Sequence, residues 1–311
     1  MVTLDRRNLL RGAALATAGI ALARPATAQE KKQLYDISLA QWSLNRQFFG
    51  RPGVEKLDPI DFAVIAKNQC GIGAIEYVNQ FYRDVVRQAG YVGELKKRAD
   101  GEGVKSLLIM CDGEGNLGDP DTKRRVTAVR NHIKWLEWAQ ELGCHSIRVN
   151  AASDGKLSYA EQQRLAADGL RRLCEIGDTY DLNVIVENHG GLSSHGRWLR
   201  GVMEMVDHPR VGTLPDFGNF YISRGQNEMQ YDRYLGTYEL MPYAKGVSAK
   251  SHDFDEQGEE IHTDFQRILK IVVDSGFQGF VGVEFEGGGD SMAGIKSTKT
   301  LLEKVRGELA A

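Results

Sequence analysis

The stretch Asn183-Val184-Ile185-Val186-Glu187-Asn188-His189 is a short apolar run that ends abruptly in a carboxylate, an amide and an imidazole. Its three consecutive β-branched residues predict a buried strand, because such side chains favour extended backbone and a strand covered on both faces is apolar throughout. A helical pattern follows over 199–206, and a second strand is expected over 211–216. A strand, a helix and a strand in this order predict a βαβ unit with parallel strands.

The same alternation extends from residue 34 to the end of the chain. The expected strands cover 35–39, 73–77, 104–110, 146–149, 183–187, 211–216, 244–250 and 279–284. The expected helices cover 59–67, 93–101, 121–142, 160–180, 199–206, 231–238, 264–275 and 297–309. Eight β-α units predict closure into a single (β/α)8 TIM barrel. A doubly wound open sheet is the alternative, and it is disfavoured because no G-x-G-x-x-G follows an early strand.

The first 28 residues have the pattern of a twin-arginine signal peptide. Arg6-Arg7-Asn8-Leu9-Leu10 precedes an apolar run over 13–23, and an A-x-A cleavage signature follows at 26–28. The run is shorter than the roughly 20 apolar residues that span a bilayer. An ordinary secretory signal that happens to contain two arginines is the alternative. We expect export to the periplasm, with the chain divided into a signal peptide over 1–28, a linker over 29–33 and a barrel over 34–311.

The composition argues against several classes of partner. The 311 residues carry a formal net charge of −3, so nothing indicates the cationic face that nucleic-acid binding requires. No apolar run long enough to span a bilayer follows the signal, so no membrane partner is expected after cleavage. An oligomer is compatible with the sequence. No C-x-x-C spacing relates the four cysteines, which predicts buried free thiols at Cys70, Cys111, Cys144 and Cys174.

The fifth to eighth expected strands end in carboxylates or an imidazole. The carboxyl ends of barrel strands meet at one rim, where barrel enzymes carry their chemistry. Converging carboxylates repel one another unless a cation lies between them. Oxygen ligands with one imidazole nitrogen suit Mn²⁺, Mg²⁺, Co²⁺ or Zn²⁺. The pattern therefore predicts a divalent-metal site formed by Glu187, Asp216, His252 and Glu284.

Over about residues 34–309 the chain resembles the xylose isomerase-like barrels, the sugar phosphate isomerase/epimerase superfamily of AP endonuclease 2-type barrels. The segments that carry the resemblance are LIMCDGEG (108–115), VENHGG (186–191), DFGNF (216–220), KSHDFD (250–255) and GVEFEG (282–287). The resemblance implies Glu, Asp, His and Glu ligands on strands five to eight. These match Glu187, Asp216, His252 and Glu284.

Two of these positions stay open. Many family members have His-x-Lys on the seventh strand, and aligning that lysine with Lys250 puts Ser248 in the place of the ligand histidine. His252 then lies two positions beyond the lysine. On the eighth strand, Glu286 shares the inner face with Glu284 and offers an alternative carboxylate.

The resemblance implies proton transfer on a carbohydrate through a metal-stabilised enediolate. Glu187 and Glu284 are the expected acid and base. Lys250 or His189 could instead protonate a leaving oxygen, which would make the reaction an elimination. The expected substrate-binding residues are Asn150, Asn188, Asn219 and Glu286.

Two departures from the family pattern leave the reaction open. Asn219 stands where the epimerases typically have histidine, and Gly258 stands where they have arginine. Three hypotheses therefore remain. They are a divalent-metal-dependent sugar isomerase or epimerase, a metal-dependent lyase or dehydratase acting on a keto-sugar or keto-glycoside, and a non-catalytic carbohydrate-binding barrel. All three expect a small-molecule carbohydrate as the partner.

The signal peptide generates the first testable prediction. Replacing the pair by Arg6→Lys and Arg7→Lys should leave the precursor in the cytoplasm, because the twin-arginine receptor reads that pair. Cell fractionation with an immunoblot measures the outcome. Normal export of the variant would assign the chain to the general secretory route instead.

Overall fold

Eight parallel strands pair edge to edge in the computed structural model, which describes residues 33–311. The predicted signal peptide and residues 29–32 of the linker lie outside this part of the chain. The eight strands follow the order β6-β5-β4-β3-β2-β1-β10-β9 in the sheet, so the first and last strands of the barrel, β1 and β10, are neighbours. The strands are β1 (Asp36–Ala40), β2 (Ala74–Val78), β3 (Lys105–Met110), β4 (Ser146–Val149), β5 (Asn183–Glu187), β6 (Val211–Leu214), β9 (Val247–Ser251) and β10 (Phe280–Phe285).

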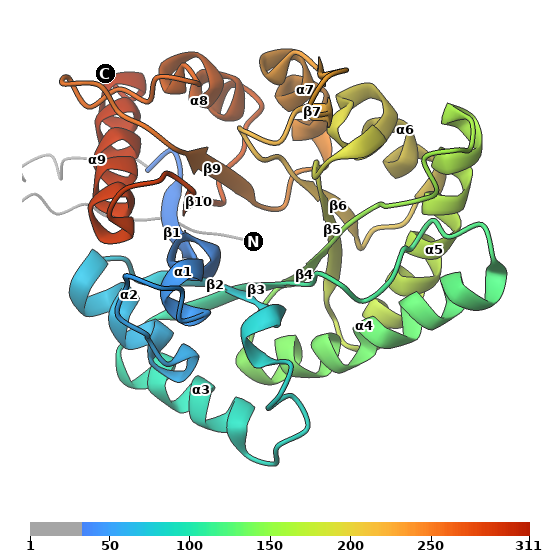
Figure 1. Cartoon of the computed structure of the whole chain (residues 1–311), viewed down its shortest axis with the longest axis horizontal. Coiled ribbons are helices and arrows are strands. Elements are labelled where there is room, and N and C mark those ends of the chain that lie inside the picture. Colours follow the sequence, from blue (N-terminus) through green and yellow to red (C-terminus); the bar gives the residue numbers. More distant parts are fainter. Residues whose placement is uncertain (1–32) are drawn as a thin grey trace, which may run out of the picture. The chain divides into compact units, whose positions relative to one another are not determined.

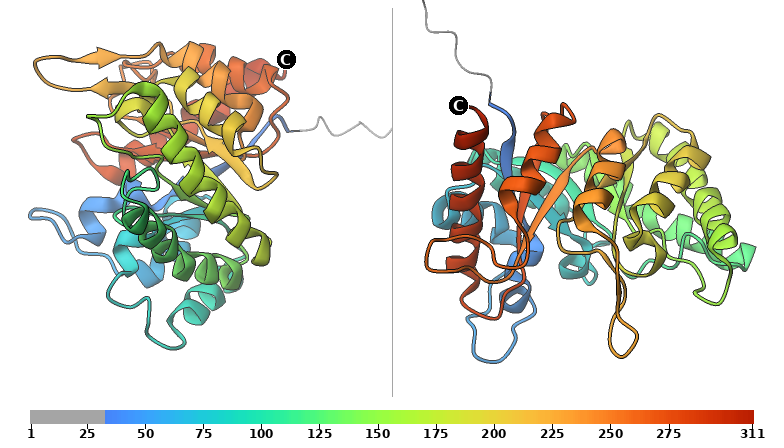
Figure 2. Two further views of the ribbon diagram at one scale, coloured as in Figure 1. Left: turned by 90° about the vertical axis from the view of Figure 1, so that its right-hand side faces the viewer. Right: turned by 90° about the horizontal axis from the view of Figure 1, so that it is seen from above.

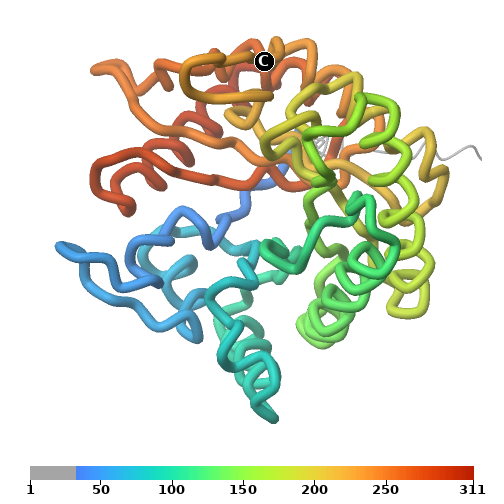
Figure 3. Tube along the Cα trace, turned by 45° about the vertical axis from the view of Figure 1, so that its right-hand side comes forward, coloured from blue at the N-terminus to red at the C-terminus, as the bar shows by residue number. Residues whose placement is uncertain are grey.

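The two ends of this sheet also meet. Parallel bridges join Thr213 to Ala244 and Asp216 to Ser248, so β6 and its extension contact the β9 segment. The backbone N–H of Phe217 donates to the Ser248 carbonyl at the same seam. The sheet is therefore curled into a ring, and the predicted (β/α)8 barrel is confirmed. Figure 3 follows the ring from β1 in blue to the C-terminal red segment beside it.

Helices surround the strands, as Figure 1 shows. A one-turn helix α1 (Asn45–Phe48) follows β1. The longer helices are α2 (Phe62–Cys70), α3 (Tyr91–Gly101), α4 (Thr122–Leu142), α5 (Tyr159–Thr179), α6 (Gly196–Val206), α7 (Arg233–Leu240), α8 (Phe265–Asp274) and α9 (Ser291–Leu309). Each overlaps a predicted helix. The largest shift is at α9, which begins at Ser291 rather than 297 because the Asp290 side chain caps the backbone N–H groups of Met292 and Ala293.

An antiparallel hairpin, formed by β7 (Tyr221–Ser223) and β8 (Met229–Gln230), interrupts the alternation after β6. Neither strand was among the eight expected from the sequence. Figure 2 shows the hairpin projecting beyond the helices, in yellow-orange. Because it follows the carboxyl end of β6, it brings Tyr221 and Arg224 to the rim where the site residues lie.

Strand alternation separates an apolar shell, between the strands and the helices, from the barrel interior, which holds a smaller apolar cluster and the charged side chains of the strand ends. On β5, Val184 and Val186 pack outward against the helices, whereas Ile185 and Glu187 face the barrel interior. All four cysteines are buried and free, which confirms that prediction. No helix within residues 33–311 combines the length and apolar character needed to cross a bilayer.

Helix α5 presses against the loop that leaves β3, and this contact generates a stability prediction. A Cβ added to Gly169 would lie 1.9 Å from the Leu117 carbonyl oxygen, so Gly169→Ala must displace backbone. We expect it to lower the free energy of unfolding by about 1–3 kcal/mol, the usual cost of overpacking. Urea unfolding followed by circular dichroism measures this.

Gly307→Ala is the matched control. Gly307 lies in α9, is exposed and has open space where its Cβ would be. Alanine is the better helix former, so this variant should gain up to about 1 kcal/mol. Equal effects of the two substitutions would contradict the close contact at Gly169.

Candidate active site at the carboxyl ends of the strands

Six charged side chains from different strands or strand ends converge inside the barrel. Each is at most 4% exposed. Buried charges are costly unless they are paired, so their mutual contacts decide how this group is arranged. We call it the central charge cluster, and its members are Glu76 on β2, Arg148 on β4, Glu187 on β5, Asp216 after β6, Lys250 on β9 and Glu284 on β10.

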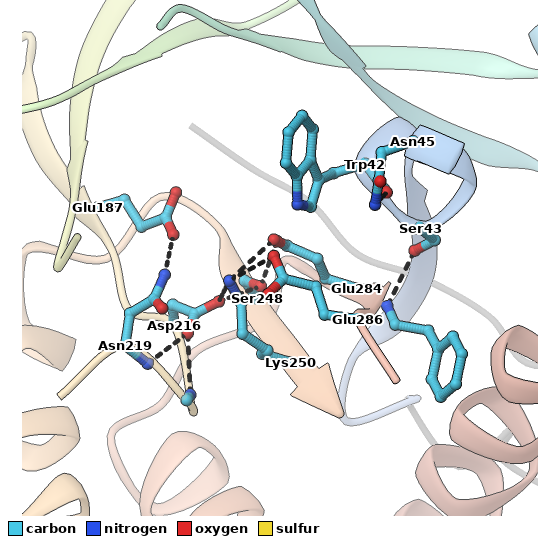
Figure 4. A network of polar contacts seen from close by, with 12 residues as sticks. Trp42, Ser43, Asn45, Glu187, Asp216, Asn219, Ser248, Lys250, Glu284 and Glu286 are labelled. Carbon is cyan, nitrogen blue, oxygen red and sulfur yellow. Dashed lines mark hydrogen bonds and ion pairs between the residues drawn. The ribbon is translucent and has the colours of Figure 1, made fainter. Parts of the chain in front are cut away.

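Lys250 lies among three carboxylates (Figure 4). Its Nζ is 3.1 Å from Glu284 Oε1, 3.1 Å from Glu286 Oε1 and 3.7 Å from Asp216 Oδ2. Burial alone would lower the pKa of Lys250, but the charges of Asp216, Glu284 and Glu286 raise it well above its usual value. Lys250 is therefore a fixed ammonium ion.

Ser248 lies two residues before Lys250, on the same face of β9, and contacts two carboxyl groups. Its Oγ is 2.7 Å from Asp216 Oδ2 and 2.8 Å from Glu284 Oε2. A hydroxyl has one proton, so it can donate to one of these groups, and the other must donate its own proton to Oγ. Burial, with Glu284 and Glu187 nearby, raises the pKa of Asp216 to about 7 despite Lys250, which fits a shared proton.

Glu187 is held by Arg148 and Asn219. The Arg148 Nε lies 2.7 Å from Glu187 Oε2, in an ion pair whose angle is too poor for a hydrogen bond. The Asn219 amide donates to Glu187 Oε1 at 2.7 Å. Burial raises the pKa of Glu187 to about 7 even with Arg148 beside it. Arg148 also binds Asp112 Oδ1 at 2.8 Å and thereby holds the pKa of Asp112 well below its usual range, against the effect of burial.

The structure places Ser248, and not His252, against Asp216 and Glu284, and the predicted four-residue metal site stays a prediction. Strand β9 ends at Ser251, and the chain then turns into a loop in which the His252 backbone N–H donates to Glu260. Ser248 occupies the inner-face position against the two carboxylates. Within residues 33–311, no group of three or more His, Cys, Asp and Glu residues is arranged to hold a metal ion.

The predicted substrate-binding asparagines divide into different roles. Asn188 is fully buried, and its amide joins the Asp216 and Asn219 backbones at 2.7–3.1 Å, so it braces the strand ends. Asn150 donates to Asp112 at 2.8 Å. Asn219 orients Glu187 and also lines a cavity. Glu286 pairs with Lys250 and lines the same cavity. Only the last two of these side chains combine a role in the charge network with access to a cavity.

Three adjoining cavities open above the central charge cluster. The first, about 270 Å³, is lined by Trp42, Arg148, His189, Glu284 and Glu286 among others. The second cavity, about 290 Å³, shares the lining residue Glu286 with the first. The third cavity, about 250 Å³, shares the lining residue His189 with the first. A larger surface pocket of about 670 Å³ lies on α5, α6 and α7. It contains no strand-end residue, so we place the site at the rim.

Sequence reasoning missed Arg148, Glu76 and Trp42. The signal for Arg148 was a charged residue inside the short β4 strand, where alternation puts it on the inner face two residues before Asn150. Glu76 offered the same signal within the β2 run. Trp42 lies in the turn directly after β1 and stacks on Phe81 with ring centroids 6.2 Å apart. Nothing in the local sequence distinguished it from a core aromatic.

A family model described as the xylose isomerase-like TIM barrel matches residues 64–305. A Xenopus laevis protein, provisionally named as a hydroxypyruvate isomerase, is 21% identical over 226 residues, which are 65% of this chain and 78% of that protein.

Two solved structures show the same barrel. The E. coli 3-keto-D-glucoside 4-epimerase YcjR has a TM-score of 0.65 at 15% identity, covering 87% of this chain and 99% of its own. A xylose isomerase-like TIM barrel protein from Mycobacterium smegmatis, in complex with magnesium, has a TM-score of 0.65 at 15% identity, covering 89% and 98%. At these identities the likeness is one of fold.

The register of β9 generates the next prediction. Ser248→Ala removes the hydroxyl between two buried carboxyl groups and should lower the free energy of unfolding by about 1–3 kcal/mol. His252→Ala removes a half-buried loop side chain and should change it by about 0.5 kcal/mol or less. Urea unfolding of both variants provides the comparison. A larger loss for His252→Ala would return the histidine to the centre of the site.

Proposed function

The chain belongs to the xylose isomerase-like TIM barrel family, and from this premise we propose that it is an isomerase or epimerase of a sugar or sugar derivative. The observation that carries the proposal is the pair Glu187 and Glu284, buried on different sides of the Lys250 ammonium (Figure 4). Two carboxyl groups that flank a cation can move a proton from one carbon to another while the cation holds the charge that develops on oxygen.

The reacting unit we propose is a hydroxyl group next to a carbonyl group. Hydroxypyruvate and a 3-keto-glucoside, which appear in the names of two similar proteins, both contain this unit. One carboxylate takes the proton from the carbon that bears the hydroxyl, and the electron pair moves onto the carbonyl oxygen. For isomerisation, the old carbonyl carbon and its oxygen each gain a proton, and the neighbouring hydroxyl loses its proton as it becomes the new carbonyl. For epimerisation, the proton returns to the opposite face of the first carbon and the carbonyl is restored.

Glu187 fits the role of the base. Its pKa of about 7 lies near neutral pH, where a general base both accepts a proton and releases it. Asn219 and Arg148 hold the carboxyl group in one orientation, which leaves the substrate and not the base to adjust. Glu284 lines the same cavity as Arg148 and is placed to return the proton.

The developing oxyanion needs a positive partner, and the side chains in this chain supply two. Arg148 lines the first cavity and Lys250 the second. The predicted Mn²⁺, Mg²⁺, Co²⁺ or Zn²⁺ fits these residues poorly. Ser248 stands in place of an imidazole, Arg148 already pairs with Glu187, and Lys250 already pairs with Glu284. We therefore assign the electrophilic role to the two side-chain cations.

A screen of α-hydroxy ketones and aldoses in D₂O, followed by NMR, tests the proposal. Deuterium should enter the recovered sugar, because the abstracted proton exchanges with solvent. Glu187→Gln and Glu284→Gln should each lower the exchange rate by about 10²–10⁴-fold, the contribution of a general acid or base. Glu137→Gln, on the exposed face of α4, is the control and should keep the parental rate.

Other outcomes of the same screen would overturn the proposal. Loss of a hydroxyl or glycosidic substituent would identify a lyase. Saturable sugar binding without deuterium exchange in any compound would identify a carbohydrate-binding barrel.

A further inference from the structure

We propose that the Lys250 ammonium occupies the place of the divalent cation, so that this barrel works with an organic cation and no metal. The inference deepens the proposed function, since it says which of the two side-chain cations takes the place of the metal. It stands on the position of Lys250, on the ligand that Ser248 fails to supply, and on the way the chain packs around the lysine stem.

The position of the ammonium is the first observation. A cation bridging Asp216 and Glu284 would have to lie between their carboxyl groups, and Lys250 Nζ is 3.7 Å from the first and 3.1 Å from the second. Metal–oxygen bonds are about 2.0–2.2 Å long for the small divalent ions. A metal bound to either carboxylate would therefore lie within about 6 Å of a buried positive charge, which repels it strongly in a poorly hydrated interior.

The donor set is the second observation. Ser248 Oγ lies against both Asp216 and Glu284, where an imidazole nitrogen would be required to complete the predicted ligand set. A neutral hydroxyl is a weak ligand compared with imidazole. The arrangement is consistent for one ammonium ion and inconsistent for a divalent metal.

The packing of the lysine stem is the third observation. A Cβ added to Gly218 would lie 2.9 Å from Lys250 Cδ and 3.1 Å from Cγ, so the glycine lets the backbone after β6 cover the stem. Lys250 is 4% exposed. The stem of the side chain is thus covered by this loop.

An ammonium ion in this place has different chemical properties from a metal. It has a single charge and three N–H donors, so it binds an oxyanion by hydrogen bonds and cannot be removed by a chelator. Three carboxylates lie 3.1–3.7 Å from it and balance its charge. The cation of the site is then encoded in the chain itself and needs no metal supply.

Metal binding tests the inference without any substrate. We expect the purified parent protein to contain no stoichiometric divalent ion when its metal content is measured by plasma mass spectrometry. We also expect it to bind Mn²⁺ only weakly, as measured by electron paramagnetic resonance. The double variant Ser248→His/Lys250→Met removes the ammonium and supplies the missing imidazole. It should bind one Mn²⁺ at least about tenfold more tightly than the parent.

Lys250→Arg is the charge-matched control and should remain metal-free. A parent with one bound divalent ion, or with Mn²⁺ affinity equal to that of the double variant, would overturn the inference. A folded double variant that gains no Mn²⁺ affinity would also overturn it, because Lys250 would then not occupy a cation position. If the double variant does not fold, the metal content and Mn²⁺ affinity of the parent decide the question.

The failure of this inference is distinct from the failure of the proposed function. An active isomerase that loses deuterium exchange after EDTA treatment, and regains it with Mn²⁺, would keep the function and remove the ammonium from the role of electrophile. A metal-free protein that exchanges deuterium into no sugar would keep the ammonium and remove the function.

Discussion

The structure depends on the neutralisation of charges inside the barrel. In the central charge cluster, four carboxyl groups face two cations, and all six side chains are buried. Arg148 neutralises Glu187 and Lys250 neutralises Glu284, while a proton shared through Ser248 lowers the remaining negative charge. Removing either cation would leave carboxylates without a partner in a medium that cannot hydrate them. In the proposed function, the same pairing that lets the barrel fold also supplies the acid, the base and the electrophile.

The backbone makes room for these charges at particular glycines. Gly282 on β10 faces Glu76, and a Cβ there would lie 2.6 Å from Glu76 Oε1. Gly218 allows the chain after β6 to lie against the stem of Lys250. Asn188 then joins the ends of β5 and β6 through its amide, which fixes Glu187 and Asp216 relative to one another. The charged groups are thus positioned by strands and close backbone contacts, and rigid placement of this kind is what proton transfer requires.

The fold could be predicted because its signal is repeated eight times, and an error in one unit leaves the others intact. Glu187, Asp216 and Glu284 could be predicted because a carboxylate that ends an apolar strand must reach the rim. The position of His252 depended on where β9 ends, and the sequence carries no clear mark of that end. The strand stops at Ser251 because the loop hydrogen-bonds to Glu260, nine residues beyond, which no local pattern reveals. Arg148 could be recognised as a site residue only from its contact with Glu187, which the sequence does not show.

Membership of the family and the identity of the cation are separable for a physical reason. The carboxylates come with the strand ends, so any chain that folds into this barrel with acidic strand ends brings them together. The cation is decided by two neighbouring inner-face positions on β9. At position 248, an imidazole would add a metal ligand, whereas the serine adds a hydroxyl proton donor. At position 250, the lysine fills the space between Asp216 and Glu284. Because the carboxylates need one positive centre and not a particular element, a barrel can retain its fold and its acid–base pair while the positive centre changes from an ion taken from solution to one carried by the chain.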